Sequence, residues 1–529
     1  MTTLGRRLRR IIELSQLRIL TWQVAGRARS DPGRLPIVFF NASTRLSGLS
    51  QNAAFSLLAS WVVRLAGVRV IHFICWSGMS RCVLGTDQDA PEQSMPCKMC
   101  TRQSRANTSG ADVRIFTYQQ DDELAAVLQS LSLDELLRYE QPLPDIAGFL
   151  PLGKLVLPSL RWRLRLQTLT DDQATRFICR EFMLSAWNVA RKFSVLLENV
   201  KPQAAVLFNG MHFPEATAAW LCRQRGVCVI THESGFQPFS GYFVEGDVTK
   251  YPINIPDVDL TPEQNARLDA DLQKRLQGEF SMAGIQFWNE MRSLPDELVQ
   301  KAAGFKQVVA VFTNVIFDTT QLHANVIFAD MFAWLDTLLE VFKAHPETLF
   351  VLRAHPDEAR PGKLSRESVA MWFEQKAAAL PNVVLIPPQE RISSYELVQL
   401  SKFVLTYNSQ IGLESTLMGV TALGAARAPF VDYDTVYFER DQEAYLRRLE
   451  SFLSAGRLEV QPEAVMHTRR FMYYRYYRFS LPFGAFVEST PPTGYVRLKR
   501  FSMHALEQSP TARALLDGLL HGKRFEMEA

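Results

Sequence analysis

Short apolar runs that end abruptly in polar or charged residues recur along this chain, and they restrict its fold more than any other feature. The clearest pair is Leu349–Leu352, followed by Arg353–Glu358, and Phe403–Tyr407, followed by Asn408–Glu414. Runs of this length, rich in β-branched and aromatic residues, are typical of strands buried in a parallel sheet. Because ligands of open α/β sheets bind at the carboxyl ends of the strands, the two polar segments predict the floor of a ligand site.

The same strand, loop and helix pattern recurs in both halves of the chain. Further strands are expected at 35–40, 68–74, 204–208, 227–230, 307–312, 383–386 and 421–424. Helical segments connect most of them, and strands joined through a helix are parallel. The loop after the first strand is poor in glycine, so it is not a dinucleotide-binding fingerprint. The pattern predicts an α/β fold with two Rossmann-like, doubly wound domains that face a central cleft.

The length of 529 residues allows two or three domains. We predict an N-terminal domain at 35–300, with a cysteine-containing insertion at 75–105, and a second domain at 301–462. A basic leader at 1–34 precedes them. The aromatic segment 463–529 is expected to be helical and to cross back to the N-terminal domain with its arginines exposed. That interpretation is favoured over base stacking by a nucleic-acid binder.

Composition narrows the class of protein. With 47% hydrophobic residues, 21% charged residues and a formal net charge of +3, the chain is typical of a globular protein and not of a nucleic-acid binder. Seven cysteines, an odd number, argue against a secreted disulfide framework and favour a reducing compartment. No stretch approaches the roughly 18 uninterrupted apolar residues of a membrane span. We therefore expect a cytoplasmic protein.

The first 34 residues combine positive charge with apolar surface. Eight arginines stand against Glu13 and Asp31, among apolar residues such as Ile11 and Trp22. One interpretation is a basic amphipathic helix that gives peripheral contact with the inner face of an anionic membrane. The other is a solvated leader or a helix packed on the body of the protein.

Four cysteines cluster in the sequence at Cys75, Cys82, Cys97 and Cys100. Four thiolates can hold zinc tetrahedrally, and the close pair Cys97 and Cys100 has the spacing of a usual half-site. Six residues separate the other pair, which is not a standard knuckle. A structural zinc site and free thiols in a loop are therefore both open, and an iron–sulfur cluster is less favoured than zinc.

Polar side chains of the second domain gather at the predicted strand ends. Arg353 and His355 can supply positive charge or hydrogen-bond donors. Thr313, Asn314 and Ser394 stand at neighbouring strand ends or helix starts, where they can donate hydrogen bonds to phosphate oxygens.

A helix predicted to begin near Ile411 directs its free N–H groups and positive dipole end at a ligand over Asn408 and Ser409. Gly412 would let that ligand approach the backbone closely. Glu414, in the first turn, can accept hydrogen bonds from a ribose diol. The structural alternative is a simple helix cap and a favourable first-turn carboxylate. The convergence at one edge favours binding of a nucleotide sugar.

In the first domain His232 and Glu233, at a strand end, are the candidates for a general base. Transfer of a sugar to a hydroxyl group requires removal of the hydroxyl proton, which an imidazole or a carboxylate can perform near neutral pH. His212 and Glu215 are competing candidates.

Four motifs resemble one known family. They are Phe312–Asp318, Arg353–Pro356, Ser393–Tyr395 and Tyr407–Glu414. Together they look like the donor half of capsule-polysaccharide-type glycosyltransferases, which are related to bacterial Kdo transferases and more distantly to polyglycerol-phosphate transferases. The resemblance covers roughly residues 306–425, is weaker over 204–245 and does not extend to the cysteines.

The resemblance implies a GT-B architecture in which the C-terminal domain holds the donor, the N-terminal domain holds the acceptor and no metal is obligatory. It implies that Arg353, His355, Ser394, Asn408 and Ser409 face the donor phosphates and that Glu414 faces donor hydroxyls.

The predicted function is transfer of a sugar from a nucleotide-activated donor to a glycan or lipid-linked acceptor in surface-polysaccharide biosynthesis. No cofactor is required for this chemistry. The alternatives are a nucleotide-sugar epimerase of the same fold and a non-catalytic, membrane-associated scaffold.

Overall fold

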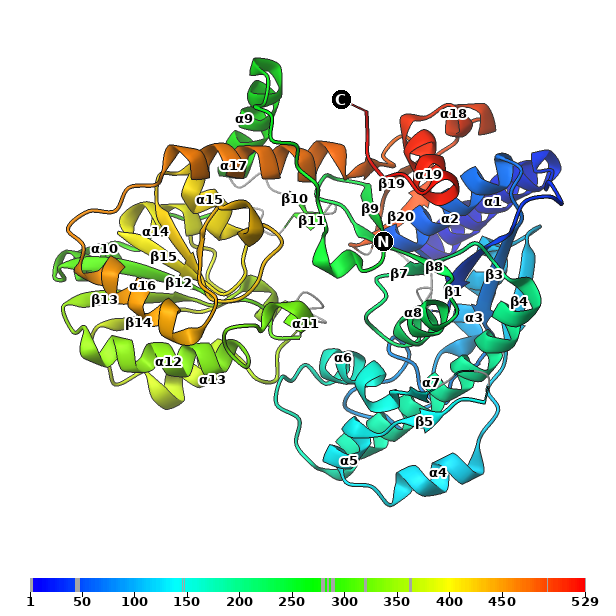
Figure 1. Cartoon of the computed structure of the whole chain (residues 1–529), viewed down its shortest axis with the longest axis horizontal. Helices are drawn as coiled ribbons and strands as arrows, with labels where there is room; N and C mark the ends of the chain where they lie inside the picture. Colours follow the sequence, from blue (N-terminus) through cyan, green and yellow to red (C-terminus); the bar gives the residue numbers. More distant parts are fainter. Residues whose placement is uncertain are drawn as a thin grey trace.

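Two sheets with helices on their faces build two α/β domains that stand side by side (Figure 1). The computed structural model describes residues 3–42, 48–144, 146, 148–276, 281–282, 285–286, 291–317, 321–360, 364–491 and 493–528. Asp318 and most of the predicted loop after the first strand, 43–47, lie outside the described residues. The architecture is GT-B-like, as the sequence predicts.

The N-terminal sheet has seven strands in the order β18-β9-β8-β7-β1-β3-β4. Its strands are β1 (Ile37–Asn41), β3 (Val70–Cys75), β4 (Asp112–Phe116), β7 (Ala204–Phe208), β8 (Cys228–Ser234), β9 (Ser240–Glu245) and β18 (Leu481–Pro482). The pairs from β8 to β4 are parallel, whereas β9 and β18 pair antiparallel at one edge.

The second sheet is entirely parallel, in the order β14-β13-β12-β15-β16-β17. Its strands are β12 (Gln307–Phe312), β13 (Thr348–Arg353), β14 (Val383–Ile386), β15 (Phe403–Thr406), β16 (Thr421–Gly424) and β17 (Tyr437–Phe438). Counted along the chain, this order is 3-2-1-4-5-6, which is that of the Rossmann fold. The order reverses between β12 and β15, and that switch point is where such sheets bind ligands.

Helices cover both sheets. In the first half they are α1 (Thr3–Arg27), α2 (Gln51–Leu65), α3 (Cys97–Asn107), α4 (Asp122–Gln129), α5 (Leu133–Arg138), α6 (Leu152–Leu164), α7 (Gln173–Val200), α8 (Glu215–Gln224) and α9 (Pro262–Leu276). In the second half they are α10 (Asp296–Ala303), α11 (Gln321–Ala324), α12 (Met331–Ala344), α13 (Val369–Lys376), α14 (Ser394–Leu400), α15 (Ile411–Leu417), α16 (Gln442–Ser454), α17 (Pro462–Tyr473), α18 (Met503–Glu507) and α19 (Pro510–His521). Short strands complete the fold at β2 (Leu49–Ser50), β5 (Gln141–Pro142), β6 (Phe149–Leu150), β10 (Ser281–Met282), β11 (Ile285–Gln286), β19 (Val487–Thr490) and β20 (Tyr495–Leu498).

Successive side chains of a strand point to opposite faces of the sheet, so the core of the second domain has two layers. Val308 and Ala310 of β12 join the cluster beneath α15 and α17, and Val309 and Val311 join the cluster beneath α12 and α16. A strand buried on both faces must be apolar at every position, which explains the continuous apolar runs in the sequence.

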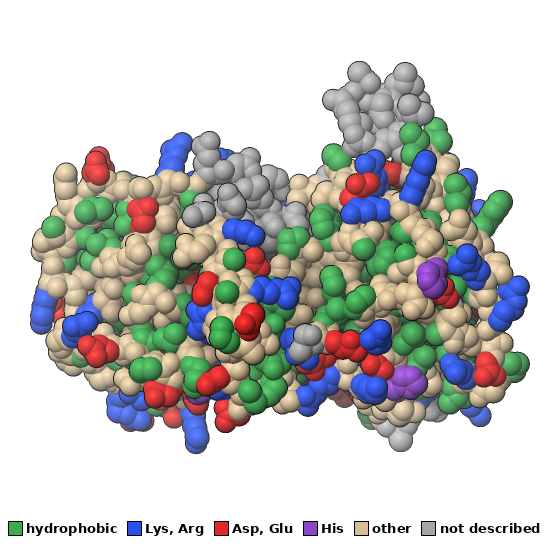
Figure 2. Space-filling model, turned by 90° about the horizontal axis from the view of Figure 1, so that it is seen from above, with side chains coloured by type: hydrophobic (Ala, Val, Ile, Leu, Met, Phe, Trp, Pro, Cys, Tyr) green, Lys and Arg blue, Asp and Glu red, His purple; other side chains and the backbone are tan. Residues whose placement is uncertain are grey.

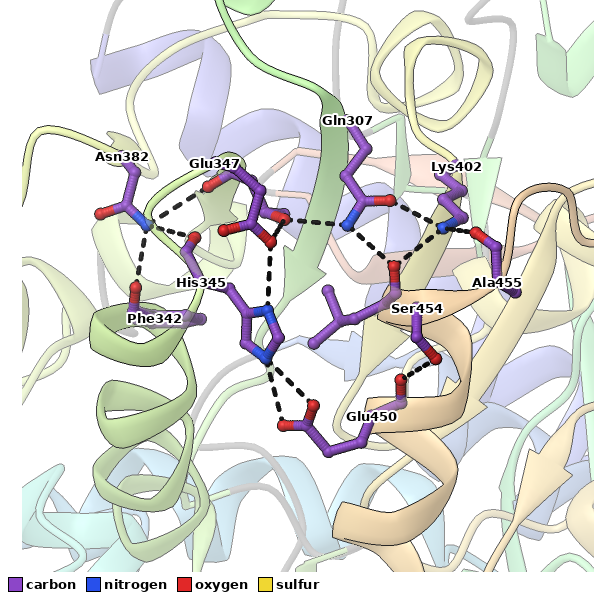
Figure 3. Close-up of polar contacts among 11 residues, drawn as sticks. Gln307, Phe342, His345, Glu347, Asn382, Lys402, Glu450, Ser454 and Ala455 are labelled. Atoms are coloured by element: carbon purple, nitrogen blue, oxygen red, sulfur yellow. Dashed lines mark hydrogen bonds and ion pairs between the residues drawn. The ribbon is translucent and has the colours of Figure 1, made fainter.

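A polar network fixes the amino-terminal edge of the same sheet (Figure 3). The Lys402 ammonium donates to Gln307 Oε1 at 2.7 Å. The Asn382 amide donates to the carbonyl oxygens of Phe342 at 2.9 Å and His345 at 3.0 Å. These contacts hold the strand starts together on the side away from the strands' carboxyl ends, which leaves the opposite edge open for a ligand.

Helix α17 runs along the top of the molecule from the second domain toward the first (Figure 1). It continues into a π-helix, Tyr474–Arg478, and the chain then returns to the N-terminal sheet as β18, which pairs with β9. Against the sequence-based expectation, arginines of this segment are not all exposed, because Arg470 and Arg475 are buried.

Helix α1 packs on the N-terminal domain along one face. Leu17, Leu20 and Val24 are buried in its core, and Gln16 Nε2 donates to the Lys499 carbonyl at 3.2 Å. The leader therefore belongs to the body of the protein and is not a solvated extension. Within the described part of the chain, none of the helices has the length and apolar character needed to cross a membrane.

Candidate functional site

A cavity of about 1030 Å³ lies over the carboxyl ends of the second sheet and also takes side chains from the segments that follow the first sheet. Its walls include eight of the predicted donor-binding residues, namely Thr313, Asn314, Arg353, His355, Ser394, Asn408, Ser409 and Glu414. The ninth, Gly412, does not line it. Strand register explains this convergence, because Phe312 pairs with both Arg353 and Thr406 and the three strands end at one level.

Two asparagines bridge the switch point of the sheet. Asn314, just after β12, donates from its amide to Asn408 Oδ1, just after β15. Gln321 Nε2 donates to the same oxygen at 3.3 Å, so both donors orient Asn408. The bridge fixes these side chains where a ligand of a Rossmann-like sheet is expected.

Arg353 is buried, and its guanidinium donates to the carbonyl oxygens of Pro387 at 2.9 Å and Glu390 at 2.7 Å. Burial lowers the pKa of Arg353 to about 10, because the charged form loses hydration. Two of its donors are thus committed to the loop after β14, while the side chain still contributes to the cavity wall.

His355 begins the turn that follows β13. Its Nδ1 accepts a hydrogen bond from the Asp357 backbone N–H at 3.1 Å, so the ring caps the short 3₁₀ helix Pro356–Ala359. The acceptor role places the ring proton on Nε2 in the neutral tautomer. Because the ring lines the cavity, it is available as a neighbour of a bound ligand.

The N-terminus of α15 differs from the prediction. The N–H groups of Gly412, Leu413 and Glu414 already donate to the carbonyls of Ser409 or Gln410. A Cβ on Gly412 would lie 3.2 Å from Thr406 Cγ2. The glycine therefore permits close packing of α15 on β15. The close approach of a ligand at this position stays a prediction.

Glu414 is almost fully buried and forms an ion pair with Arg275 of α9 at 3.2 Å. Gln410 Nε2 also donates to Glu414 Oε1, at 3.1 Å, and to the Tyr476 hydroxyl, at 2.7 Å. The carboxylate thus closes a network that joins α9, α15 and the π-helix. Its role toward donor hydroxyls stays a prediction.

The charges of the cavity wall do not balance. Its three acidic residues each pair with an arginine: Asp357 with Arg360 at 3.4 Å, Glu414 with Arg275 at 3.2 Å and Asp432 with Arg427 at 2.7 Å. Lys250, Arg353 and Arg475 also line the cavity and form no ion pair with any residue that the structure describes. Three positive charges are therefore left for a ligand.

Arg475 is buried in the cavity wall, and it was not among the predicted site residues. Its guanidinium lies 3.5 Å from the centre of the Phe236 ring and 5.5 Å from that of Tyr251, and Gln410 Oε1 accepts from it at 3.5 Å. Burial lowers its pKa to about 10. The only hint of this role in the sequence is the aromatic and basic segment after Pro462. The fold is needed to show that Arg475 of this segment lines the cavity.

The two predicted bases occupy different environments. His232 has 1% of its surface exposed, its ring stacks on Phe243 with centroids 5.0 Å apart, and burial lowers its pKa to about 3. It does not line the cavity, so the structure provides no route from this imidazole to a substrate. Glu233 is half-buried and accepts from Asn52 at 2.7 Å and Asn209 at 2.9 Å. Glu233 does not line the cavity either, but of the pair it is the one that hydrogen bonds orient and that is partly open.

The competing candidates are no better placed. Glu215 is buried in the first turn of α8. His212 packs edge-on against Trp162, with ring centroids 5.8 Å apart. Neither lines the cavity.

The four clustered cysteines line a separate cavity at the N-terminal domain. None of the four is in a disulfide. Across the described ranges, no group of three or more His, Cys, Asp or Glu side chains is placed to hold one metal ion. A zinc ion at Cys75, Cys82, Cys97 and Cys100 stays a prediction.

A scan against protein-family models and a search of curated proteins both find no match. Solved structures similar to this chain include the beta Kdo 2,4 transferase KpsC of Thermosulfurimonas dismutans, at 14% identity over 56% of this chain and 84% of that one, with a TM-score of 0.34. Another is the UDP-GlcNAc 2-epimerase from Neisseria meningitidis bound to UDP-GlcNAc, at 11% identity over 83% and 98%, with a TM-score of 0.25. Similarity at this level carries no functional information, so the chemistry of the cavity must decide.

Proposed function

We propose that the chain is a glycosyltransferase that moves a sugar from a nucleotide-activated donor to a glycan or lipid-linked acceptor in surface-polysaccharide assembly. The excess of three positive charges in the cavity is the observation that carries the proposal. Arg353 and Arg475 are buried, whereas Lys250 is exposed. Buried cations without carboxylate partners cost free energy in the ligand-free protein, and an anionic ligand compensates them. A nucleotide sugar supplies one or two phosphate charges together with a neutral sugar that polar side chains can orient.

The reaction needs charge stabilisation at one end and proton removal at the other. The bond between the sugar C1 and the phosphate oxygen breaks, and the electron pair leaves with the nucleotide. A new bond joins C1 to the acceptor oxygen, whose proton passes to a base. Lys250, Arg353 and Arg475 would stabilise the leaving phosphate, so side chains serve where other enzymes use a metal ion. Glu233 is the proposed base.

For the acceptor side we propose peripheral contact with an anionic membrane through α1. Opposite its buried face, Ile11, Ile12, Ile19 and Trp22 are 54–70% exposed. Arg18 and Arg27 are exposed on the same helix. Figure 2, seen from above, shows hydrophobic and basic side chains interspersed over the end of the molecule that holds the N-terminal domain. Basic residues flanking exposed apolar ones suit a surface of anionic lipid.

Donor binding and turnover test the proposed activity. A thermal-shift panel of nucleotides and nucleotide sugars is expected to reveal one donor class that stabilises the protein, by about 2.7 kcal/mol at a hundredfold excess over its dissociation constant. With that donor and a polysaccharide or lipid-linked acceptor, we expect release of nucleotide and elongation of the acceptor. Stabilisation by no nucleotide, or formation of a donor epimer without acceptor, would contradict the proposal.

A further inference from the structure

Three separate segments bring four cysteines to one cavity. Cys75 ends β3, Cys82 lies in the following loop, and Cys97 and Cys100 occupy the first turn of α3. Ala42, after β1, and Pro214, before α8, line the same cavity. It therefore lies at the carboxyl edge of the N-terminal sheet, apart from the cavity assigned above to the donor.

Two of the thiols sit in matching loops. The N–H of Gly78 donates to Cys75 Sγ at 3.2 Å, and the N–H of Gly85 donates to Cys82 Sγ at 3.2 Å, so each sulfur accepts from the residue three positions later. A Cβ on Gly85 would lie 3.0 Å from Cys82 Sγ, which explains a glycine there. Backbone N–H groups aimed at sulfur stabilise a thiolate and tune the cluster that it binds.

Cys97 and Cys100 lie at the N-terminus of the 11-residue helix α3, whose dipole favours negative charge. Arg163 of α6 interacts electrostatically with Asp87 and, more weakly, with Cys82, and its buried Nε has no hydrogen-bond partner among the described residues. Negative charge at the sulfurs would interact favourably with the helix N-terminus.

The four thiols share one cavity, and the kind of group that they could hold depends on how closely they converge. Tetrahedral zinc needs its ligands to converge on one ion, with sulfur atoms about 3.8 Å apart at a Zn–S distance of 2.3 Å. Among the described residues, no three or more His, Cys, Asp or Glu side chains are placed to hold one metal ion together. A cubane cluster is different, because each of its four irons takes a single thiolate and inorganic sulfide supplies the rest.

We propose that Cys75, Cys82, Cys97 and Cys100 hold a four-iron iron–sulfur cluster that fastens the insertion between β3 and β4 to the edge of the N-terminal sheet. The role is structural, and it does not depend on the donor site.

The test is metal and sulfide analysis of the full chain, expressed and purified without oxygen. We expect about four iron and four acid-labile sulfide per chain, with a broad visible absorption that dithionite bleaches. One zinc per chain without sulfide, or a chain without metal, would overturn the proposal. Because this measurement uses the unsubstituted protein, it is decisive whether or not variants fold.

Variants then assign the ligands. Cys82→Ser and Cys100→Ser are expected to lose the absorption and most of the iron and to unfold at lower temperature. Cys228→Ser is the matched control, because Cys228 is a half-exposed free thiol in β8 that does not line this cavity. Equal iron and sulfide content in all three variants would contradict the assignment. Failure of sugar transfer with an intact cluster would refute only the proposed function.

Discussion

Replacing Arg475 with methionine tests two opposite effects of a buried cation. The charge lowers the stability of the ligand-free protein, and it strengthens binding of the donor. In the ligand-free protein burial lowers the pKa of Arg475 from 12.5 to about 10. A depression of this size corresponds to about 3 kcal/mol of destabilisation of the charged form. The penalty is present in full at neutral pH. It falls as the pH rises from 10 to 12.5, because in this range the folded protein has released the proton that the unfolded chain still holds.

Packing against aromatic rings offsets part of that penalty. The guanidinium lies over Phe236 at 3.5 Å, and contacts of this kind contribute about 0.5–2 kcal/mol. Methionine keeps an apolar side chain of similar length in the same place. Arg475→Met is therefore expected to stabilise the ligand-free protein by about 1–2 kcal/mol. At the same time it should weaken donor binding by about 1.5–3 kcal/mol, roughly 10–150-fold, the value of one charged hydrogen bond.

Urea denaturation measures the first effect, and isothermal titration with the donor found in the thermal-shift panel measures the second. Arg469→Met is the matched control, because Arg469 lies on α17, pairs with Asp269 at 2.7 Å and does not line the cavity. The control should lose a little stability and bind the donor normally. An Arg475→Met protein that binds the donor as tightly as the parent would refute the reasoning.

Three further changes test other parts of the structure. Burial raises the pKa of Glu358 from 4.5 to about 8, so the folded protein retains a proton that the unfolded chain releases, and stability should fall by about 5 kcal/mol as the pH rises from 4.5 to 8. In urea denaturation Glu358→Gln should match the parent at pH 5 and exceed it at pH 8.5, and parallel pH profiles would contradict this. Asn382→Ala removes the amide that donates to backbone carbonyls at the amino-terminal edge of the second sheet. It should cost about 2–3 kcal/mol in denaturation while donor affinity is unchanged, and a loss of affinity would show that this edge is not independent of the cavity. Trp22→Asp should abolish sedimentation with phosphatidylglycerol vesicles, whereas Val195→Asp, at another exposed apolar residue on α7, should not. Equal binding of both variants would exclude α1 as the membrane contact.

The strands were predictable because each domain repeats one simple pattern. Runs such as Leu349–Leu352 are apolar at every position, since both faces of a parallel sheet are covered, and the observed strand Thr348–Arg353 contains that run. The convergence of Arg353, Asn314 and Asn408 was equally predictable, because polar residues that follow parallel strands meet at one edge.

What sequence could not supply was the direction of individual side chains. His232 has the residue type and strand-end position of a base, but its ring faces Phe243 in the core. The packing of Gly412 against Thr406 was not predicted from the sequence. Arg475 arrives at the cavity through a π-helix, a local irregularity that periodicity does not reveal. Each of these depends on contacts between segments far apart in the chain.

The most direct test of the account is the position of donor phosphate in a crystal of the complex. We predict that the phosphate oxygens lie within hydrogen-bond distance of Arg475 and beside Arg353 and Lys250, above the Asn314–Asn408 bridge. Nucleotide bound elsewhere on the protein, or phosphate directed away from these three cations, would contradict the claim that uncompensated charge in the interdomain cavity holds the donor.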